Sequence, residues 1–265
     1  MKSENSGIKV YNENISCLAY ADDIVILADT PNKLNNLLKI LERWCTNWAL
    51  EINTNKSQIV HFRPKKVNIT NHAFSINDIE LEKVSTYRYL GVLFDEFLTF
   101  ETAVNTLSTA AGRALGSVCT KFKVMNEMGF TTYETLYNNC VTPVLDYGSE
   151  IWGTKHFSKA DSIQNRAMRF YLGVHRFAPN LAVQGDIGWL SCSSRWSINI
   201  IRYWNRLINM HENRLTRRVF NWDFSICRNN WSHKVKALLI NLNLVTSFHN
   251  QITCDLNEVT QKLYD

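Results

Sequence analysis

Two adjacent carboxylates, Asp22 and Asp23, are the residues whose type and spacing most directly suggest chemistry. They lie between two short apolar runs, residues 15–20 and 24–28, which predict a tight β-hairpin. Neighbouring carboxylates repel each other, and a divalent cation such as Mg²⁺ binds carboxylate oxygens and relieves that repulsion. Because aspartate is also common in ordinary turns, the pair alone would favour a structural turn over a metal site.

Basic residues are concentrated in the second part of the chain. The sequence has 29 Lys and Arg against 24 Asp and Glu. Residues 1–110 carry 11 basic and 13 acidic side chains, whereas residues 111–265 carry 18 and 11. Between Lys155 and Lys236 the numbers are 14 and 4. This distribution indicates a polyanionic partner for the second part, although a set of solvated helix faces explains the charge equally well.

Arginines of the basic part are candidates for contacts with phosphate groups. Arg202 and Arg206 stand four residues apart in a predicted helix, so they share one face and could span neighbouring phosphates. Aromatic residues between them, such as Trp204, belong to the apolar face of the same helix and are expected in the core rather than stacked on bases. The candidates are Arg166, Arg169, Arg202, Arg206, Arg217 and Arg218.

The elements that must position these residues change in type near residue 98. Apolar and β-branched runs predict strands within residues 8–95, with a helix that begins at Thr30 and Pro31. Later strands are expected at residues 58–62, 73–79 and 86–94. The predicted fold class is α+β, with a first domain at residues 1–97 and a helical second domain at residues 98–265.

The helices of the second domain are predicted from an apolar period close to 3.6. One helix follows Thr99. Glu134 stands three residues after Thr131, which predicts a capping box at Thr131 that starts another helix. This helix is expected to run past Pro143. Two more are expected at residues 158–172, closed by Gly173, and at about residues 191–213.

The cysteines and the hydropathy profile exclude several classes of protein. The 7 cysteines form no C-x-x-C pair, and no apolar run approaches the roughly 20 residues that span a bilayer. We therefore expect reduced thiols in an intracellular protein, nuclear or cytoplasmic, without a membrane partner. A zinc site could be imagined from Cys227, His233, His249 and Cys254, but their spacing fits no compact ligand framework.

Several motifs, in a consistent order, resemble those of the reverse transcriptases of non-LTR (LINE-type) retrotransposons. Residues 18–26, Leu-Ala-Tyr-Ala-Asp-Asp-Ile-Val-Ile, resemble the Y-x-D-D motif. Residues 50–57 resemble L-x-I-N-x-x-K-[ST], and residues 89–92 resemble the Y-L-G-[VI] segment called the primer grip. Residues 143–153 resemble P-x-L-x-Y-G-x-x-x-W-G, and residues 163–174 are similar to the pattern that follows it. The resemblance runs from about residue 15 to about residue 210.

The resemblance implies an RNA-directed DNA polymerase that uses two Mg²⁺ ions and binds an RNA template with a DNA primer. Residues 1–97 would form the C-terminal half of the palm domain, with an antiparallel sheet and an amphipathic helix. Residues 98–265 would form a helical thumb and connecting region. The partner would then be an RNA/DNA hybrid held by the basic second domain.

The same resemblance assigns a role to individual residues. Asp22 would bridge both metal ions and Asp23 would support it, whereas Lys56 would be a general acid for the pyrophosphate leaving group. A lysine in a polar turn is otherwise most often simply solvated. Contacts with nucleic acid are implied for Tyr20, Ala21, Leu90, Gly91, Arg166, Arg169, Arg202 and Arg206. For Gly91, a bulge in a strand is an equally good explanation.

The resemblance also predicts that this chain is incomplete as a polymerase. In the family, a strand with a third carboxylate, together with the fingers, precedes the hairpin, but only 19 residues stand before Tyr20. Two adjacent aspartates from one turn are not expected to hold two metal ions alone. We therefore expect an upstream polymerase segment or self-association as a partner. The alternatives are a non-catalytic nucleic-acid-binding remnant and a decayed element without a selected function.

Overall fold

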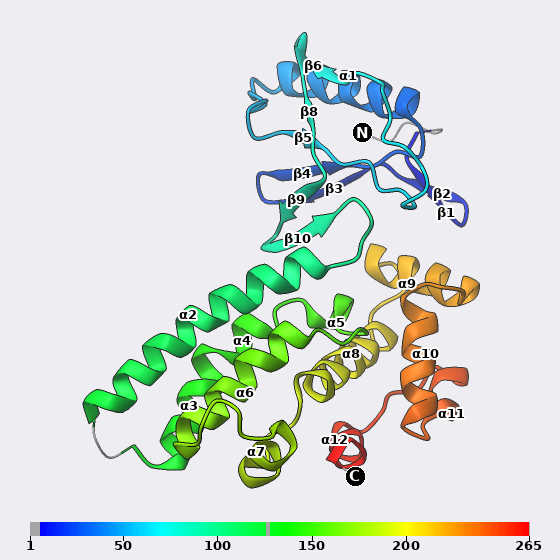
Figure 1. Ribbon diagram of the computed structural model, residues 1–265. Coiled ribbons are helices and arrows are strands. Elements are labelled where there is room, and N and C mark those ends of the chain that lie inside the picture. The colour runs from blue at the N-terminus through cyan, green and yellow to red at the C-terminus, as the bar shows by residue number, and fades with distance from the viewer. Residues whose placement is uncertain (1–5, 126–127, 265) are drawn as a thin grey trace. The chain divides into compact units, whose positions relative to one another are not determined.

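The computed structural model describes residues 6–125 and 128–264. The chain divides into two units, residues 1–99 and 100–265, close to the predicted boundary at 97/98. In the described part, the first unit consists of short strands and the helix α1, and the second unit consists of helices (Figure 1). This mixture confirms the α+β class. No helix in the described ranges is long and apolar enough to cross a membrane.

The strands of the first unit pair in twos. The antiparallel pairs are β1 (Ile8–Val10) with β2 (Glu13–Ile15), β3 (Cys17–Tyr20) with β4 (Asp23–Ile26), β6 (Ser75–Ile76) with β7 (Ile79–Glu80), and β9 (Thr86–Tyr89) with β10 (Val92–Asp95). A parallel pair joins β5 (Gln58–Ile59) to β8 (Glu82–Lys83). Every antiparallel pair is joined by two residues, so each pair forms a tight β-hairpin.

The helix α1 (Pro31–Asn47) begins where the sequence predicts. Thr30 Oγ1 accepts a hydrogen bond from Lys33 N at 3.4 Å, and Pro31 occupies the first helical position. α1 lies against β4 and β6 (Figure 1). Its apolar face forms the core of the unit with side chains from the strands and loops: Leu38, Leu41, Cys45, Ile59, Phe74, Ile76 and Leu81.

Three predicted strands need correction. The strand predicted at residues 86–94 is wrong, because Leu90 (φ 46°) and Gly91 (φ 83°) turn the chain back and make it the hairpin β9–β10. The strand predicted at residues 73–79 is wrong for the same reason, since Asn77 and Asp78 also have positive φ and form the tip of β6–β7. At residues 58–62, only Gln58 and Ile59 are in a strand.

The second unit is built from α2 onward. Its described helices are α2 (Glu101–Met125), α3 (Phe130–Cys140), α4 (Thr142–Leu145), α5 (Ser149–Trp152), α6 (Ser158–Leu172), α7 (Asn180–Ile187), α8 (Cys192–Ile208), α9 (Leu215–Ile226), α10 (Trp231–Asn241), α11 (Val245–His249) and α12 (Leu256–Tyr264). α2 packs on α3, α4 and α6, and α8 packs on α5, α9, α10 and α12. α8 therefore joins the first helices of the unit to the last ones.

The helix predictions for this unit succeed where a local signal ends the helix. α6 covers the predicted residues 158–172 and ends at Gly173, which has a φ of 67°. The helix predicted from Thr131 past Pro143 is wrong: α3 ends at Cys140 and α4 starts at Thr142. Pro143 has no N–H with which to continue the hydrogen bonding of α3. The capping box at Thr131 is also wrong, because Gly129 is the N-cap and no side chain caps it.

Aromatic side chains fill the core of the second unit. On α8, Trp196 and Trp204 are 1% and 0% exposed, which confirms that they belong to the core and are not available to stack on bases. The Trp152 and Trp196 rings meet edge to face at 4.9 Å, and the Trp204 ring stacks on Phe248 at 5.3 Å. The orientation of α8 is therefore set by these buried aromatic contacts with Trp152 and Phe248.

Candidate functional site

The hairpin β3–β4 carries the carboxylate pair at its tip. Tyr20 pairs with Asp23 across the hairpin, so the turn consists of Ala21 and Asp22 alone, and Asp23 is the first residue of β4. Ala21 has a φ of 53°, a conformation that favours glycine or asparagine and is strained for alanine. Tyr20 is 64% exposed, and both aspartates are exposed as well. The hairpin therefore presents two carboxylates and an aromatic ring to solvent.

The hairpin β9–β10 lies close enough to β3–β4 for their charges to interact. Burial raises the pKa of the Tyr89 phenol, and the nearby Asp23 carboxylate and Cys17 thiol raise it further. Tyr89 is the last residue of β9 and directly precedes the turn of Leu90 and Gly91. The structure thus brings the Y-L-G segment next to the Asp23 side of the carboxylate pair, two regions that lie more than sixty residues apart in sequence.

Lys56 lies in an ordered turn of the same unit. Its backbone N–H donates to the carbonyl oxygen of Asn53 at 3.1 Å and to Asn53 Oδ1 at 3.2 Å. Ser57 Oγ donates to the same carbonyl at 2.9 Å. The Lys56 side chain is exposed, and among the described residues no ion pair joins it to Asp22 or Asp23. The L-x-I-N-x-x-K-S pattern is therefore explained locally as a turn organised by Asn53.

In the described part of the chain, the acidic, histidine and cysteine side chains do not gather into a larger metal site. Within residues 6–125 and 128–264, no three such side chains are placed to hold one ion together. Asp22 and Asp23 remain a pair, and the cysteines and histidines considered for zinc form no cluster. Two carboxylates can still fit Mg²⁺, because this ion commonly takes one or two carboxylates and completes its shell with water and substrate phosphates.

The two arginines of α8 point away from the core of the second unit. Arg202 and Arg206 are both exposed, whereas Trp204 between them is buried. Arg202 Nη1 donates to Asn199 Oδ1 at 2.7 Å on the same helix, which holds the side chain along the helix surface. The sequence prediction that these two guanidinium groups share an accessible helix face agrees with this geometry.

Arg166 and Arg169 of α6 differ in how they are used. Arg166 is exposed and donates from Nη2 to the carbonyl oxygen of Gly112 at 3.2 Å. Arg169 is half-buried and donates from Nε and Nη2 to the carbonyl oxygen of Ala178 at 3.2 and 2.8 Å. It also donates to Asn180 Oδ1. Arg169 therefore holds the segment after α6 in place, which the sequence does not reveal.

The P-x-L-x-Y-G-x-x-x-W-G motif supports a buried ion pair. Asp146 of this motif accepts from Arg195 Nε and Nη2 at 3.0 and 3.2 Å and from Trp196 Nε1 at 2.9 Å. Gln164 accepts from Arg195 and from Cys192 Sγ. Burial alone would lower the pKa of Arg195, but the Asp146 carboxylate more than offsets this, so the pKa lies above its usual range. The motif therefore organises the core.

Sequence reasoning missed two residues of these sites. Tyr89 belongs to the Y-L-G segment, and its position directly before Leu90 and Gly91 is the only sequence signal for its role. Arg195 carried no signal, because its partner Asp146 stands 49 residues away in sequence. Both contacts depend on which elements pack together, and periodicity does not encode that.

Comparisons with known proteins agree with the motifs. Residues 3–94 match the family described as "Reverse transcriptase (RNA-dependent DNA polymerase)". The chain is 25% identical over 209 residues to the "Probable RNA-directed DNA polymerase from transposon BS" of Drosophila melanogaster, covering 76% of this chain and 23% of that protein. It is 22% identical over 220 residues to the "RNA-directed DNA polymerase from mobile element jockey" of the same organism, covering 80% and 24%.

A third relative is similar over a shorter stretch. A "Putative uncharacterized transposon-derived protein" of Caenorhabditis elegans is 30% identical over 149 residues, which cover 55% of this chain and 51% of that protein. The chain spans about a quarter of the length of the two Drosophila proteins. No solved structure matches the chain significantly.

Proposed function

We propose that this chain provides part of the RNA-directed DNA polymerase of a non-LTR retrotransposon. Residues 3–94 match the reverse transcriptase family, and the chain is similar to RNA-directed DNA polymerases of Drosophila transposons. The observation that carries the proposal is the β3–β4 hairpin. Its two carboxylates are exposed at a tip of two residues, inside the segment that matches the family. The first unit would then act as part of a palm and the second as a thumb and connecting region.

In this proposal Asp22 and Asp23 hold Mg²⁺, which when bound polarises phosphate oxygens and neutralises their charge. Tyr20 and Ala21 lie on the turn beside the carboxylates and would contact the end of the primer. Leu90 and Gly91 form a second exposed tip, next to Tyr89, and their backbone would lie against the primer strand. The proximity of Tyr89 and Asp23 supports this grouping of the two hairpins.

Lys56 would protonate the pyrophosphate leaving group. Its ammonium group is exposed, so it has room to approach a bound nucleotide. An aspartate on a third strand, supplied by an upstream polymerase segment, would complete the metal site. Self-association of this chain is the other arrangement that would cover its open strand edges.

The metal site can be tested by Mn²⁺ binding to the full chain, detected through the paramagnetic broadening of its NMR signals. Asp22→Asn should weaken binding more than Asp23→Asn, because Asp22 is proposed as the principal metal ligand and Asp23 as the supporting one. Asp78→Asn is the matched control, since Asp78 is also exposed at the tip of a hairpin, β6–β7. Equal Mn²⁺ binding by the wild type and all three variants would refute the site.

The basic second unit favours a second candidate function, the grip on an RNA/DNA hybrid without chemistry. Arg202 and Arg206 are exposed on one face of α8, where they can reach neighbouring phosphates. Replacing both by alanine should reduce the slope of log K against log salt for a hybrid by about one to two units. Hybrid binding with this salt dependence, but no Mn²⁺ binding at Asp22, would select the second function over the first.

A further inference from the structure

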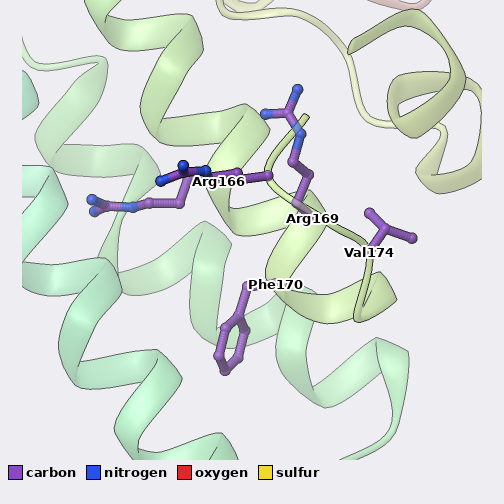
Figure 2. A pocket seen from close by; sticks show the side chains of 5 residues that line it. Arg166, Arg169, Phe170 and Val174 are labelled. Carbon is purple, nitrogen blue, oxygen red and sulfur yellow. The ribbon is translucent and has the colours of Figure 1, made fainter. Parts of the chain in front are cut away.

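A pocket of about 310 Å³ opens beside the C-terminal half of α6. It is lined by Arg166, Arg169, Phe170, Val174 and Arg176. Figure 2 shows Arg166, Arg169 and Phe170 extending from the helix and Val174 on the segment that follows it. Three of the five lining residues are arginines, whose planar guanidinium groups suit phosphate oxygens.

The segment after α6 is folded into a fixed shape. Arg169 holds the carbonyl oxygen of Ala178, and the Ala178 N–H donates to the carbonyl oxygen of His175 at 2.9 Å. The Val174 N–H donates to the carbonyl oxygen of Arg169 at 3.2 Å. These bonds join the two ends of the segment to α6, so Arg176 and Phe177 are presented on an ordered loop rather than a loose one.

Phe177 is an exposed aromatic ring at this loop. It is 75% exposed, and Arg176 Cζ lies 4.7 Å from its ring centroid, with the His175 ring at 5.1 Å. An arginine stacked on an aromatic ring is a stable arrangement that leaves other parts of the ring accessible. In the described part of the unit, Phe177 belongs to none of the core clusters, so its ring is available to a ligand.

The charged side chains that line the pocket are all positive, and the stretch between Asp161 and Asp186 carries no acidic residue. From Ser162 to Gly185 the sequence contains three arginines and a histidine. Lys123 of α2 lies 5.9 Å from the centroid of Phe170, which lines the pocket, and adds a fourth permanent positive charge. A partner that offers negative charge at regular intervals, together with flat apolar groups, fits this surface.

We propose that the pocket and the Phe177 loop bind a single strand of nucleic acid. Backbone phosphates lie in the arginine pocket, and a base stacks on Phe177. A single strand is required, because the bases of a duplex are paired and stacked on one another and cannot cover a protein ring. The inference rests on the proposed function and extends it, since it gives the polymerase fragment a contact for unpaired template beside its contacts for the hybrid.

The experiment measures binding of the full chain to fluorescent 12-nucleotide single strands, rU12 and dT12, by anisotropy at several salt concentrations. Phe177→Ala should weaken binding about 10-fold without changing the salt dependence, because stacking releases no counterions. Phe177→Trp should retain the affinity and Phe177→Leu should not. Arg176→Gln should reduce the salt slope by about 0.7, the contribution of one phosphate contact in a single strand.

Two control variants separate the site from general effects of charge and surface. Tyr264→Ala removes a ring that is 61% exposed elsewhere in the unit, and Arg228→Gln removes an exposed arginine outside the pocket. Both should bind the single strands like the wild type. A Phe177→Ala variant that also binds like the wild type would overturn the inference, as would a wild type that binds neither strand.

The outcome is separable from that of the proposed function. Loss of single-strand affinity in Phe177→Ala, with no Mn²⁺ binding at Asp22, would support the inference and refute the metal site. Mn²⁺ binding that depends on Asp22, with single-strand affinity that is independent of Phe177, would do the reverse.

Discussion

The two units of this chain use their motif residues in opposite ways. In the first unit, the motif residues Tyr20, Asp22 and Asp23 are exposed at the tip of a hairpin, and the small core lies elsewhere, between α1 and the short strands. In the second unit, the motif residue Trp152 lies in the core, and Asp146 is half-buried in an ion pair with Arg195. A resemblance to one family can thus rest both on residues exposed to solvent and on residues that hold the fold together.

This contrast indicates which motif residues are candidates for a function and which are needed for folding. Residues that folding does not require are free to be selected for chemistry, and Ala21 with its positive φ even works against the stability of its hairpin. By contrast, the Asp146 carboxylate accepts three hydrogen bonds from Arg195 and Trp196 inside the protein, so it is needed for folding. Substitutions in the two units should therefore separate stability from binding.

The largest effect on stability is expected for Asp146→Ala. The variant leaves the guanidinium of Arg195 buried without its carboxylate, which costs about 3–5 kcal/mol. Urea unfolding followed by tryptophan fluorescence measures it, since Trp152 and Trp196 lie beside the ion pair. Asp29→Ala is the control, because Asp29 pairs with Lys33 at an exposed site and should cost less than about 1 kcal/mol. Similar losses in both variants would contradict the structural role of Asp146.

A smaller effect is expected for Gly153→Ala, at the end of the same motif. A Cβ at this position would lie 2.5 Å from the carbonyl oxygen of Ser149 and 2.7 Å from Trp196 Cβ. The backbone must shift to relieve these contacts, at a cost of about 1–3 kcal/mol. Gly116→Ala is the matched control, since nothing lies within 4 Å of its Cβ and alanine favours the helix. A neutral Gly153→Ala would show that the motif does not need glycine for packing.

The sequence predicted the elements whose ends are set by local chemistry. Thr30 with Pro31 marks the start of α1, and Gly173 marks the end of α6, because each residue caps its own helix. At β9–β10 the sequence predicts one strand instead of a hairpin, because the apolar residues on both sides of Leu90 and Gly91 form a single apolar pattern. The parallel pair of β5 and β8 has no local signal at all, because it joins residues 24 positions apart.

The candidate sites follow the same rule. Asp22 and Asp23 could be found from sequence because both carboxylates belong to one hairpin tip. The nearness of Tyr89 to Asp23, and the use of Arg169 to hold Ala178, depend on packing between separate segments. Residue type alone therefore identified the exposed arginines of α8 but not the structural role of Arg169.

The buried thiol of Cys192 predicts a loss of stability at alkaline pH. Burial raises its pKa from 9.0 to about 12, so the native state keeps a proton that the unfolded chain loses. The contribution of this thiol is complete below pH 9 and falls by about 1.4 kcal/mol per pH unit between pH 9 and 12. Urea unfolding at pH 8 and pH 10 should show a smaller decrease for Cys192→Ser than for the wild type. Cys140→Ser, which changes an exposed cysteine, should behave like the wild type.

The smallest effect on stability is expected at the hairpin tip, where Asp23→Asn should change the free energy of unfolding by less than about 0.5 kcal/mol. The same variant should lower the pKa of Tyr89, because it removes a negative charge that disfavours the phenolate. Burial, the first cause of the raised pKa, remains, so the value should stay above that of an exposed tyrosine. The titration can be followed by NMR of ¹³C-labelled tyrosine. Asp78→Asn, at the tip of β6–β7, should leave the pKa of Tyr89 unchanged.

If Asp23→Asn destabilises the chain as strongly as Gly153→Ala, the carboxylate belongs to the fold, and the contrast between the two units is wrong. If stability is kept and the pKa of Tyr89 does not move, the hairpins β3–β4 and β9–β10 do not meet, and the grouping of Asp23 with Leu90 and Gly91 in one site loses its support.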